Sequence, residues 1–142
     1  MNKTLYYLEH HDTIPKEYEE VLYHGISEES LHAKGLSPIR SFSIFIKDQK
    51  ENILGGASGT LFYGSLYVDS LWIDKALRHQ GWGTKLMHEA ENLGRKHGAS
   101  FVTLNTMDWE ALPFYQKLGY STEFTREGDE QGSKMVMLRK NL

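Results

Sequence analysis

The stretch from residue 78 to residue 84 has the residue types of a binding site for a bulky anion. It reads Arg78-His79-Gln80-Gly81-Trp82-Gly83-Thr84 and lies between an apolar segment and a long amphipathic one. The start of a helix offers backbone N–H groups without intrahelical partners and the positive end of the helix dipole. Glycine at positions 81 and 83 removes two Cβ atoms, so that a pyrophosphate can approach the backbone. The alternative, a strand-to-helix turn that needs glycine for its own conformation, stays open from these residues alone.

Two common phosphate-binding motifs do not fit this stretch. A Walker loop ends in Gly-Lys-Ser/Thr after four intervening residues, whereas Gly83-Thr84-Lys85 has another order and spacing. The dinucleotide fingerprint needs a third glycine at position 86, which is Leu86 here. We therefore predict neither a P-loop nor a Rossmann-type dinucleotide site.

A second motif lies downstream, and the two together resemble a known superfamily. Arg78, Gly81 and Gly83 match Arg/Gln-x-x-Gly-x-Gly/Ala at the start of a long helix, the pattern of the GNAT superfamily of N-acetyltransferases. Residues 111–120, Ala-Leu-Pro-Phe-Tyr-Gln-Lys-Leu-Gly-Tyr, resemble that family's Ala-x-x-Phe-Tyr-x-Lys-x-Gly-Phe/Tyr segment. One departure is Asp108, which stands where the family often has asparagine, so a cofactor contact there is left open.

The resemblance implies an acyltransferase that uses acetyl-CoA as co-substrate. Backbone N–H groups of residues 79–84 would hold the CoA pyrophosphate, and the pantetheine arm would lie between splayed ends of the segments 65–73 and 101–105. An amine would attack the thioester directly while a backbone N–H of the central strand polarises its carbonyl. The implied cofactor-binding residues are Leu71, Trp72, Ile73, Arg78, His79, Gln80, Gly81, Trp82, Gly83, Thr84 and Asn105.

Tyr115 and Asp69 are the candidate catalytic residues. Tyr115 matches the family's usual general acid, which protonates the departing thiolate; its alternative is a core aromatic residue beside Phe114. Asp69 is the one charge in an otherwise apolar strand, where an unpaired carboxylate is costly to bury and would suit a general base. A structural aspartate bonded to backbone or to a cation is the alternative for Asp69.

Other charged residues give weaker signals. The chain has no cysteine, and no pair among its seven histidines has helical i, i+4 spacing with a third ligand nearby, so no metal site is predicted. Five glutamates could attract a cationic acceptor or could form a solvated helix face. These are Glu17, Glu19, Glu20, Glu28 and Glu29.

Length and composition limit the number of domains and the classes of protein to which these motifs can belong. The chain has 142 residues, which suits one domain over residues 1–142, and a formal net charge of −3, the wrong sign for a nucleic-acid-binding protein. Without cysteine no disulfide framework exists. No apolar run is long enough to span a bilayer, and we expect a soluble cytoplasmic protein without a membrane partner.

The elements that must position these residues indicate an α/β (α+β) domain of three layers. Apolar patterning predicts strands at residues 4–8, 42–47, 53–60, 65–73, 101–105, 121–126 and 135–139, and helices at 16–24, 28–34, 83–97 and 111–118. Residues 65–73 have apolar side chains at both parities, as expected of a central strand covered on both faces. Pro15 and Ser27 would begin the first two helices, and Gly98 would end the third. The order predicts a GNAT-like, mixed and mostly antiparallel central sheet with helices on both faces.

A non-catalytic acyl-CoA-binding or sensing module is the alternative function. Such a module would keep Gly81 and Gly83 without using Tyr115, and the intact tyrosine favours the enzyme. The acceptor is left open as a small-molecule or peptide amine, because the first 50 residues, where such enzymes usually build the acceptor site, contain no recognisable motif. The family resemblance also allows a homodimer.

Overall fold

The computed structural model describes residues 3–142, and the chain divides into two compact units. The first unit ends at Pro38, and the second is Ile39–Leu142. Met1 and Asn2, which begin the predicted domain, lie outside the described residues. The assignment of residues 1–142 to a single domain stays a prediction.

The first unit contains one helix, α1, which spans Lys16–Lys34 and follows Pro15 as predicted. The two predicted helices, 16–24 and 28–34, are wrong as separate elements, because the helix runs through Gly25 and buries Ser27 instead of beginning there. A glycine costs a helix about 1 kcal/mol, which is too little to end a helix of 19 residues. The predicted strand at 4–8 is also wrong: residues 3–11 have no regular secondary structure, and residues 3–38 contain no strand to pair with them.

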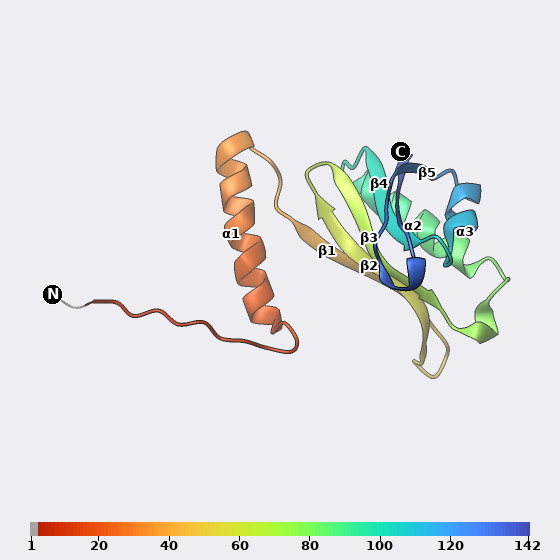
Figure 1. Ribbon diagram of the computed structural model, residues 1–142, viewed down its shortest axis with the longest axis horizontal. Coiled ribbons are helices and arrows are strands. Elements are labelled where there is room, and N and C mark those ends of the chain that lie inside the picture. Colours follow the sequence, from red (N-terminus) through yellow and green to blue (C-terminus); the bar gives the residue numbers. More distant parts are fainter. Residues whose placement is uncertain (1–2) are drawn as a thin grey trace. The chain divides into compact units, whose positions relative to one another are not determined.

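The second unit is built on a six-stranded sheet (Figure 1). Its strands are β1 (Arg40–Lys47), β2 (Ile53–Phe62), β3 (Ser65–Ile73), β4 (Phe101–Met107), β5 (Ser121–Arg126) and β6 (Met135–Asn141). They lie in the order β1-β2-β3-β4-β6-β5, and every neighbouring pair is antiparallel except β3 and β4, which are parallel. The prediction of a mixed, mostly antiparallel sheet is confirmed, and so are the six strands predicted after residue 40.

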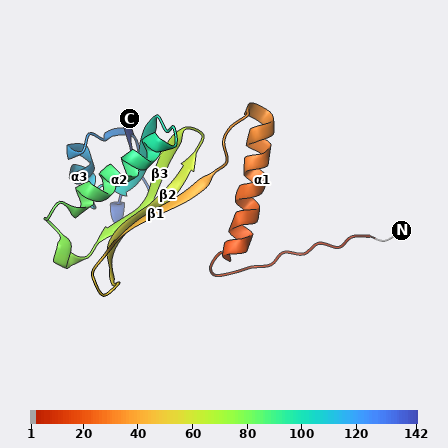
Figure 2. The ribbon, with the colours of Figure 1, turned by 180° about the vertical axis from the view of Figure 1, so that it is seen from behind.

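Two α-helices pack on one face of this sheet (Figure 2). They are α2 (Trp82–Lys96) and α3 (Leu112–Lys117), and two short 3₁₀ turns, η1 (Lys75–Leu77) and η2 (Glu130–Gly132), complete the unit. Met87 and Ala90 of α2 share a core with Leu66, Leu104 and Tyr115, so both helices cover the same side. A helix layer on the opposite face stays a prediction.

Local signals placed the ends of these helices correctly. Gly98 follows the last turn of α2 with a φ of 80°, the left-handed conformation expected after a helix. Pro113 lies in the first turn of α3, where a missing N–H costs no intrahelical hydrogen bond.

A buried ionic contact joins α2 to the C-terminal part of the chain. Glu91 is 2 % exposed, and its Oε1 accepts a hydrogen bond from Nζ of Lys140 at 3.0 Å. Its Oε2 accepts a hydrogen bond from the hydroxyl of Tyr120 at 2.8 Å. Burial, and then the hydrogen bond to Glu91, raises the pKa of Tyr120 well above its usual range, so the phenol stays a donor. Because Tyr120 follows α3 closely, this contact connects α2, α3 and β6.

Candidate active site

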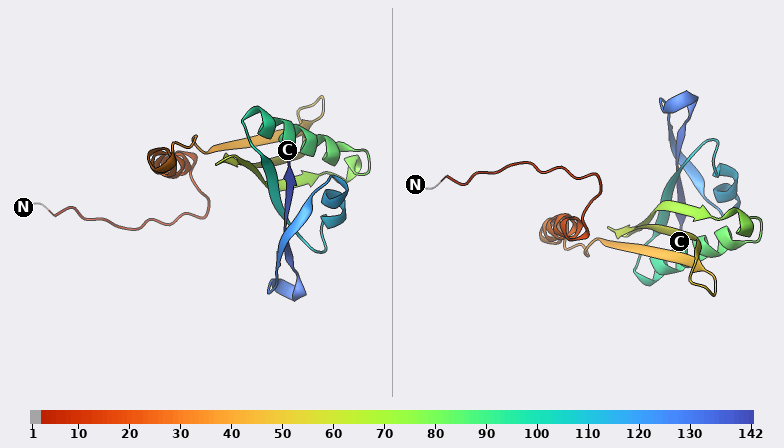
Figure 3. Two further views of the ribbon diagram at one scale, coloured as in Figure 1. Left: turned by 90° about the horizontal axis from the view of Figure 1, so that it is seen from above. Right: turned by 90° about the horizontal axis from the view of Figure 1, so that it is seen from below.

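The sheet opens between its two central strands. β3 and β4 pair only over residues 65–68 and 101–104. Beyond that point β3 continues beside β2 alone, and β4 continues beside β6 alone. Figure 3 shows the two groups, β1-β2-β3 and β4-β6-β5, running in different directions. Residues 69–73 of β3 therefore have a strand neighbour on one edge only, at the position where splayed ends were predicted.

A β-bulge explains why β3 departs from β4. Gly59 of β2 lies opposite Val68, but the preceding Ser58 lies opposite Ser70, which leaves Asp69 as an extra residue in β3. A bulge bends its strand and increases the local twist. The divergence thus begins at the one charged residue of the strand.

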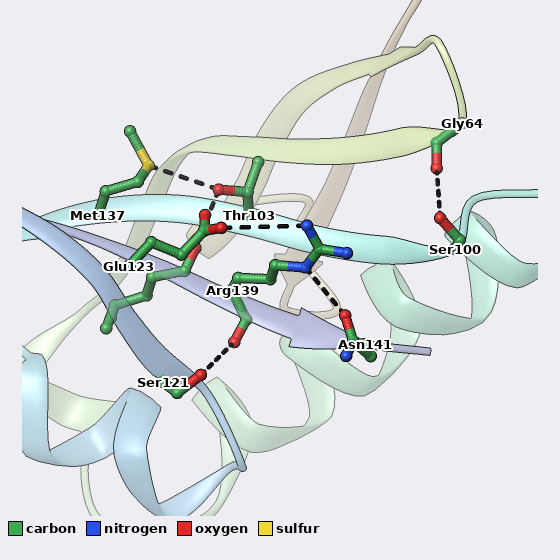
Figure 4. A network of polar contacts seen from close by, with 9 residues as sticks. Gly64, Ser100, Thr103, Ser121, Glu123, Met137, Arg139 and Asn141 are labelled. Carbon is green, nitrogen blue, oxygen red and sulfur yellow. Dashed lines mark hydrogen bonds and ion pairs between the residues drawn. The ribbon is translucent and has the colours of Figure 1, made fainter.

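Side-chain contacts hold the group β4-β6-β5 together (Figure 4). Oγ1 of Thr103 donates a hydrogen bond to the carbonyl of Leu138 at 2.9 Å. The guanidinium of Arg139 lies 3.8 Å from the ring centre of Phe101 and forms an ion pair with Glu123. β4 therefore stays with β6 and β5 while β3 turns away with β2.

The expected burial of Asp69 is wrong. The side chain is exposed, and Ser58 donates a hydrogen bond to its Oδ1 at 3.0 Å. Only the first half of β3 is covered, because the bulge and the missing neighbour leave the second half open to solvent. Asp69 is thus a candidate base through its position at the opening, and not through burial.

Tyr67 is a residue of this opening that sequence analysis missed. Nδ2 of Asn105 donates a hydrogen bond to the Tyr67 hydroxyl at 2.7 Å, across the point where the strands part. The signal was present in the strand alternation: Tyr67 lies opposite Thr103 in the parallel pair, so Asn105, two residues on, shares its face. One of the two side-chain amide hydrogens of Asn105 is therefore occupied, which leaves the other hydrogen and the side-chain carbonyl oxygen for any further contact.

The start of α2 has the features of an anion site. Gly81 is its N-cap with a φ of 83°, His79 also has a positive φ of 62°, and no side chain caps the helix. The first turn contains no acidic residue, and the ladder of helical hydrogen bonds begins with Lys85 N–H to the carbonyl of Gly81 at 3.1 Å. The N–H groups of residues 82–84 precede that ladder and point out of the helix end.

Side chains of the loop fasten it to the preceding elements. Nε of Arg78 donates to the carbonyl of Ile73, the last residue of β3, at 3.0 Å. Nε2 of Gln80 donates to the carbonyl of Ala76 at 3.0 Å. These bonds set the backbone of the loop at the end of the open strand, and the bond from Arg78 uses the carbonyl of Ile73.

Gly83 lies against α3. A Cβ built on Gly83 would be 3.0 Å from Cζ and 3.2 Å from Cε1 of Phe114. The glycine therefore has a packing role that was not anticipated, in addition to its predicted role in the approach of a phosphate. It also places α3 beside the first turn of α2.

We expect Gly83→Val to lower the free energy of unfolding by about 1 to 3 kcal/mol, because the added side chain overpacks the contact with Phe114. Acetyl-CoA should also bind at least tenfold more weakly, since the first turn of α2 must shift. Urea unfolding and acetyl-CoA titration measure the two effects. Adding Phe114→Leu, which shortens the opposing side chain, should recover part of the stability; equal losses in the single and double variants would contradict the packing role.

Tyr115 combines a buried ring with an unpaired hydroxyl. The residue is 6 % exposed, and its ring makes edge contacts with Phe114 and Tyr120 at centroid distances of 5.0 and 6.0 Å. Within residues 3–142 its hydroxyl has no hydrogen-bond partner. Burial, and then the charge of Glu110, raises the pKa of Tyr115 to about 12. The arrangement provides a protonated phenol whose hydrogen is free for a bound molecule.

Asp108 holds two parts of the fold together. Its Oδ1 accepts a hydrogen bond from the N–H of Lys134 at 3.0 Å, and its own N–H donates to the carbonyl of Lys134 at 2.9 Å. One carboxylate oxygen is thus used between the end of β4 and the start of β6.

Other charged residues considered in the sequence belong to the first unit. The five glutamates considered for steering an acceptor all lie on α1. Across residues 3–142, no three His, Asp or Glu side chains gather closely enough to hold a metal ion. Nor does that part of the chain contain a helix with the length and apolar character needed to cross a membrane.

Comparisons with known proteins identify the family. The profile of the acetyltransferase (GNAT) domain matches residues 10–142. An acetyltransferase from Agrobacterium fabrum is 31% identical over 110 residues, which are 78% of this chain and 80% of that protein. A blasticidin-S acetyltransferase from Streptomyces morookaense is 31% identical over 84 residues, which are 58% of this chain and 62% of that protein.

Solved structures have the same fold. A protein from Agrobacterium tumefaciens aligns over 100% of both chains with a TM-score of 0.78 and 28% identity. An acetyltransferase from Bacillus cereus aligns over 94% of this chain and 98% of its own with a TM-score of 0.75 and 26% identity. Profile, sequence relatives and structures agree, and the chain therefore belongs to the GNAT family of acetyltransferases and is an acetyl-CoA-dependent N-acetyltransferase.

Proposed function

We propose that the second unit binds acetyl-CoA along the opening between β3 and β4 and transfers its acetyl group to an amine that attacks directly in a ternary complex. One observation supports this most: the open edge of β3 ends at Ile73, and the chain then leads through a short loop into the uncapped start of α2. A strand edge suits the amide-rich pantetheine arm, and the helix start suits the pyrophosphate.

The residues present fit such a co-substrate. The first turn of α2 has no acidic side chain that would repel phosphate, and Lys85 lies over the Trp82 ring at 4.4 Å, which places a cation beside that turn. Leu71 and Trp72 lie on the stretch of β3 without a β4 neighbour. We assign Asp108 no contact with acetyl-CoA, because its carboxylate binds the backbone of Lys134.

In the proposed reaction Tyr115 donates a proton to the leaving group, and Asp69 can accept the proton that the amine loses. The bound thioester supplies an activated acyl carbon and a thiolate leaving group. As the amine nitrogen forms its bond to that carbon and the carbon–sulfur bond breaks, the Tyr115 phenol gives its proton to the sulfur. The proton lost by the amine passes to water or to the carboxylate of Asp69, which is exposed at the bulge. Backbone N–H groups of the open edge stabilise the carbonyl oxygen as it gains charge.

The relatives support an amine-bearing small molecule as the acceptor. One of them is named a blasticidin-S acetyltransferase and matches this chain at 31% identity.

Acetyl-CoA should stabilise the folded protein, whereas NADH and ATP, which lack the pantetheine arm, should not. At 100 times its Kd a ligand of the native state adds about 2.7 kcal/mol, which for a chain of this size raises Tm by roughly 8 °C. Differential scanning calorimetry measures the shift. Equal shifts with acetyl-CoA and ATP would indicate a general phosphate site, and no shift at millimolar acetyl-CoA would contradict the proposed function.

A further inference from the structure

The carboxylate of Glu110 lies at the open edge of β4. The N–H of Asp108 donates to the carbonyl of Lys134, just before β6, at 2.9 Å. Backbone N–H groups alternate between the two edges of a strand, so the N–H of the preceding Met107 points away from β6. Oε1 of Glu110 accepts a hydrogen bond from that N–H at 3.1 Å. Because pairing with β3 ends at residue 104, this carboxylate lies on the side of β4 that faces the opening.

The turn that contains Glu110 is fastened on both sides. Nε1 of Trp109 donates a hydrogen bond to Oγ of Ser133 at 2.9 Å. The N–H of Ala111 donates to Oγ1 of Thr106 at 3.4 Å. The position of Glu110 thus follows from the contacts of β4 and its turn, and it does not depend on what covers either face of the sheet.

This carboxylate lies close enough to Tyr115 to act on its hydroxyl. After burial, the charge of Glu110 is the second cause that raises the pKa of Tyr115. Within residues 3–142 Glu110 forms no ion pair, and its Oε2 has no hydrogen-bond partner. The proposed function places the leaving sulfur at the Tyr115 phenol. A negative charge without a counterion therefore lies beside the place where the amine attacks.

The chemistry of the reaction decides which positive charge can neutralise Glu110. The attacking amine must be unprotonated, because its lone pair forms the new bond to the acyl carbon. The pantetheine arm of the co-substrate has no charge. A counterion for Glu110 therefore has to be a second cationic group on the acceptor, and an ammonium group there would form a charge-assisted hydrogen bond with Oε2.

We propose that Glu110 is a specificity-determining residue that selects small diamines as acceptors. Its Oε2 binds the distal ammonium while the other amine, unprotonated, attacks the thioester. Glu110 exchanges no proton in this step, so the roles of Tyr115 and Asp69 stay as proposed above. The inference rests on the proposed function, because it takes Tyr115 as the group that protonates the leaving thiolate.

The test measures equilibrium binding of amines in the presence of CoA, so that no turnover is needed. Calorimetric titration compares unbranched diamines of three to six methylene groups with the monoamine of the same length. A symmetric diamine has a twofold statistical advantage, because either end can bind. At one length or more we expect the diamine to bind about fivefold more tightly, as an ion pair at an exposed carboxylate allows. At about 1 M NaCl the preference should fall to twofold, because salt screens that charge.

A matched pair of variants isolates the charge of Glu110. Glu110→Gln keeps a side-chain oxygen for the N–H of Met107 but removes the charge, so the diamine preference should fall to about twofold while the Kd for acetyl-CoA stays within a few-fold. Glu89→Gln makes the same change at an exposed position of α2 and should keep the preference. Glu110→Ala also removes the hydrogen bond to Met107. If Glu110 served only to hold the turn, Glu110→Ala would lose the preference and Glu110→Gln would keep it.

The outcomes separate this inference from the proposed function. A protein that binds acetyl-CoA but prefers no diamine by more than twofold, or binds no amine, contradicts the inference alone. Equal losses in Glu110→Gln and Glu89→Gln would do the same, because general surface charge would then explain both. If Glu110→Gln does not fold, the salt dependence of the wild-type preference decides, and a preference unchanged by salt overturns the inference. Failure to bind acetyl-CoA would instead contradict the proposed function.

Discussion

Tyr115→Phe should lower kcat for acetyl transfer by roughly 10²-fold while the Kd for acetyl-CoA stays within a few-fold, because a positioned general acid contributes about 10² to 10⁴ to the rate. The phenylalanine ring keeps the edge contacts with Phe114 and Tyr120. The lost hydroxyl has no hydrogen-bond partner within residues 3–142, so its removal leaves no buried group unpaired. Steady-state kinetics and acetyl-CoA titration of both proteins check the result.

The raised pKa of Tyr115 has a consequence for stability as well. Burial moves this pKa from 10.0 to about 12, so the phenol keeps its proton throughout the neutral range. Between pH 10 and 12 the unfolded chain loses this proton while the folded chain retains it, and the free energy of unfolding therefore falls as the pH rises. Tyr115→Phe should lose less stability than the wild type over that interval, as measured by urea unfolding.

Tyr120→Phe is the matched control, since it makes the same change in the neighbouring buried tyrosine. Here the hydroxyl donates to Oε2 of Glu91 at 2.8 Å, and its removal leaves a buried acceptor without that bond. We expect a loss of about 1 to 3 kcal/mol in the free energy of unfolding, with kcat little changed below the melting transition. Wild-type turnover in Tyr115→Phe would show that Tyr115 serves only to pack the core.

Glu91→Leu should lower the free energy of unfolding by about 3 kcal/mol, because breaking a buried ion pair leaves its partner uncompensated. The carboxylate is 2 % exposed and binds both Lys140 and Tyr120. The ammonium of Lys140 is 24% exposed and can partly turn to water, which keeps the expected loss at the lower end of the range for buried pairs. Chemical denaturation monitored by circular dichroism measures the change.

Two further variants test whether the stability lost in Glu91→Leu comes from the buried ion pair. Glu89→Leu introduces the same side chain at an exposed position of the same helix, and it should change stability by less than about 0.5 kcal/mol. Glu91→Leu combined with Lys140→Met replaces the charged pair with apolar groups and should recover much of the loss. If Glu91→Leu and Glu89→Leu were equally stable, the buried ion pair would contribute nothing to the fold.

Sequence alone determined the features that depend on short stretches of chain. The glycines at 81 and 98, the proline at 113 and the alternation or helical spacing of apolar residues act within a few positions, and they predicted α2, α3 and the six strands of the second unit. The two motifs that resemble the GNAT family also lie within short segments. The same local reasoning failed in the first unit, where Gly25 and Ser27 resemble a helix boundary but their cost is smaller than the stability of a continuous helix.

Tertiary structure alone decided how the candidate site is assembled. The bulge at Asp69 follows from the register of β2 against β3, and it turns a carboxylate that was expected inside the core out to solvent. Gly83 meets Phe114, and Glu91 meets Tyr120 and Lys140 across 29 and 49 positions of sequence. Such pairings depend on which strands become neighbours and at what register, and no pattern within a short window contains that information.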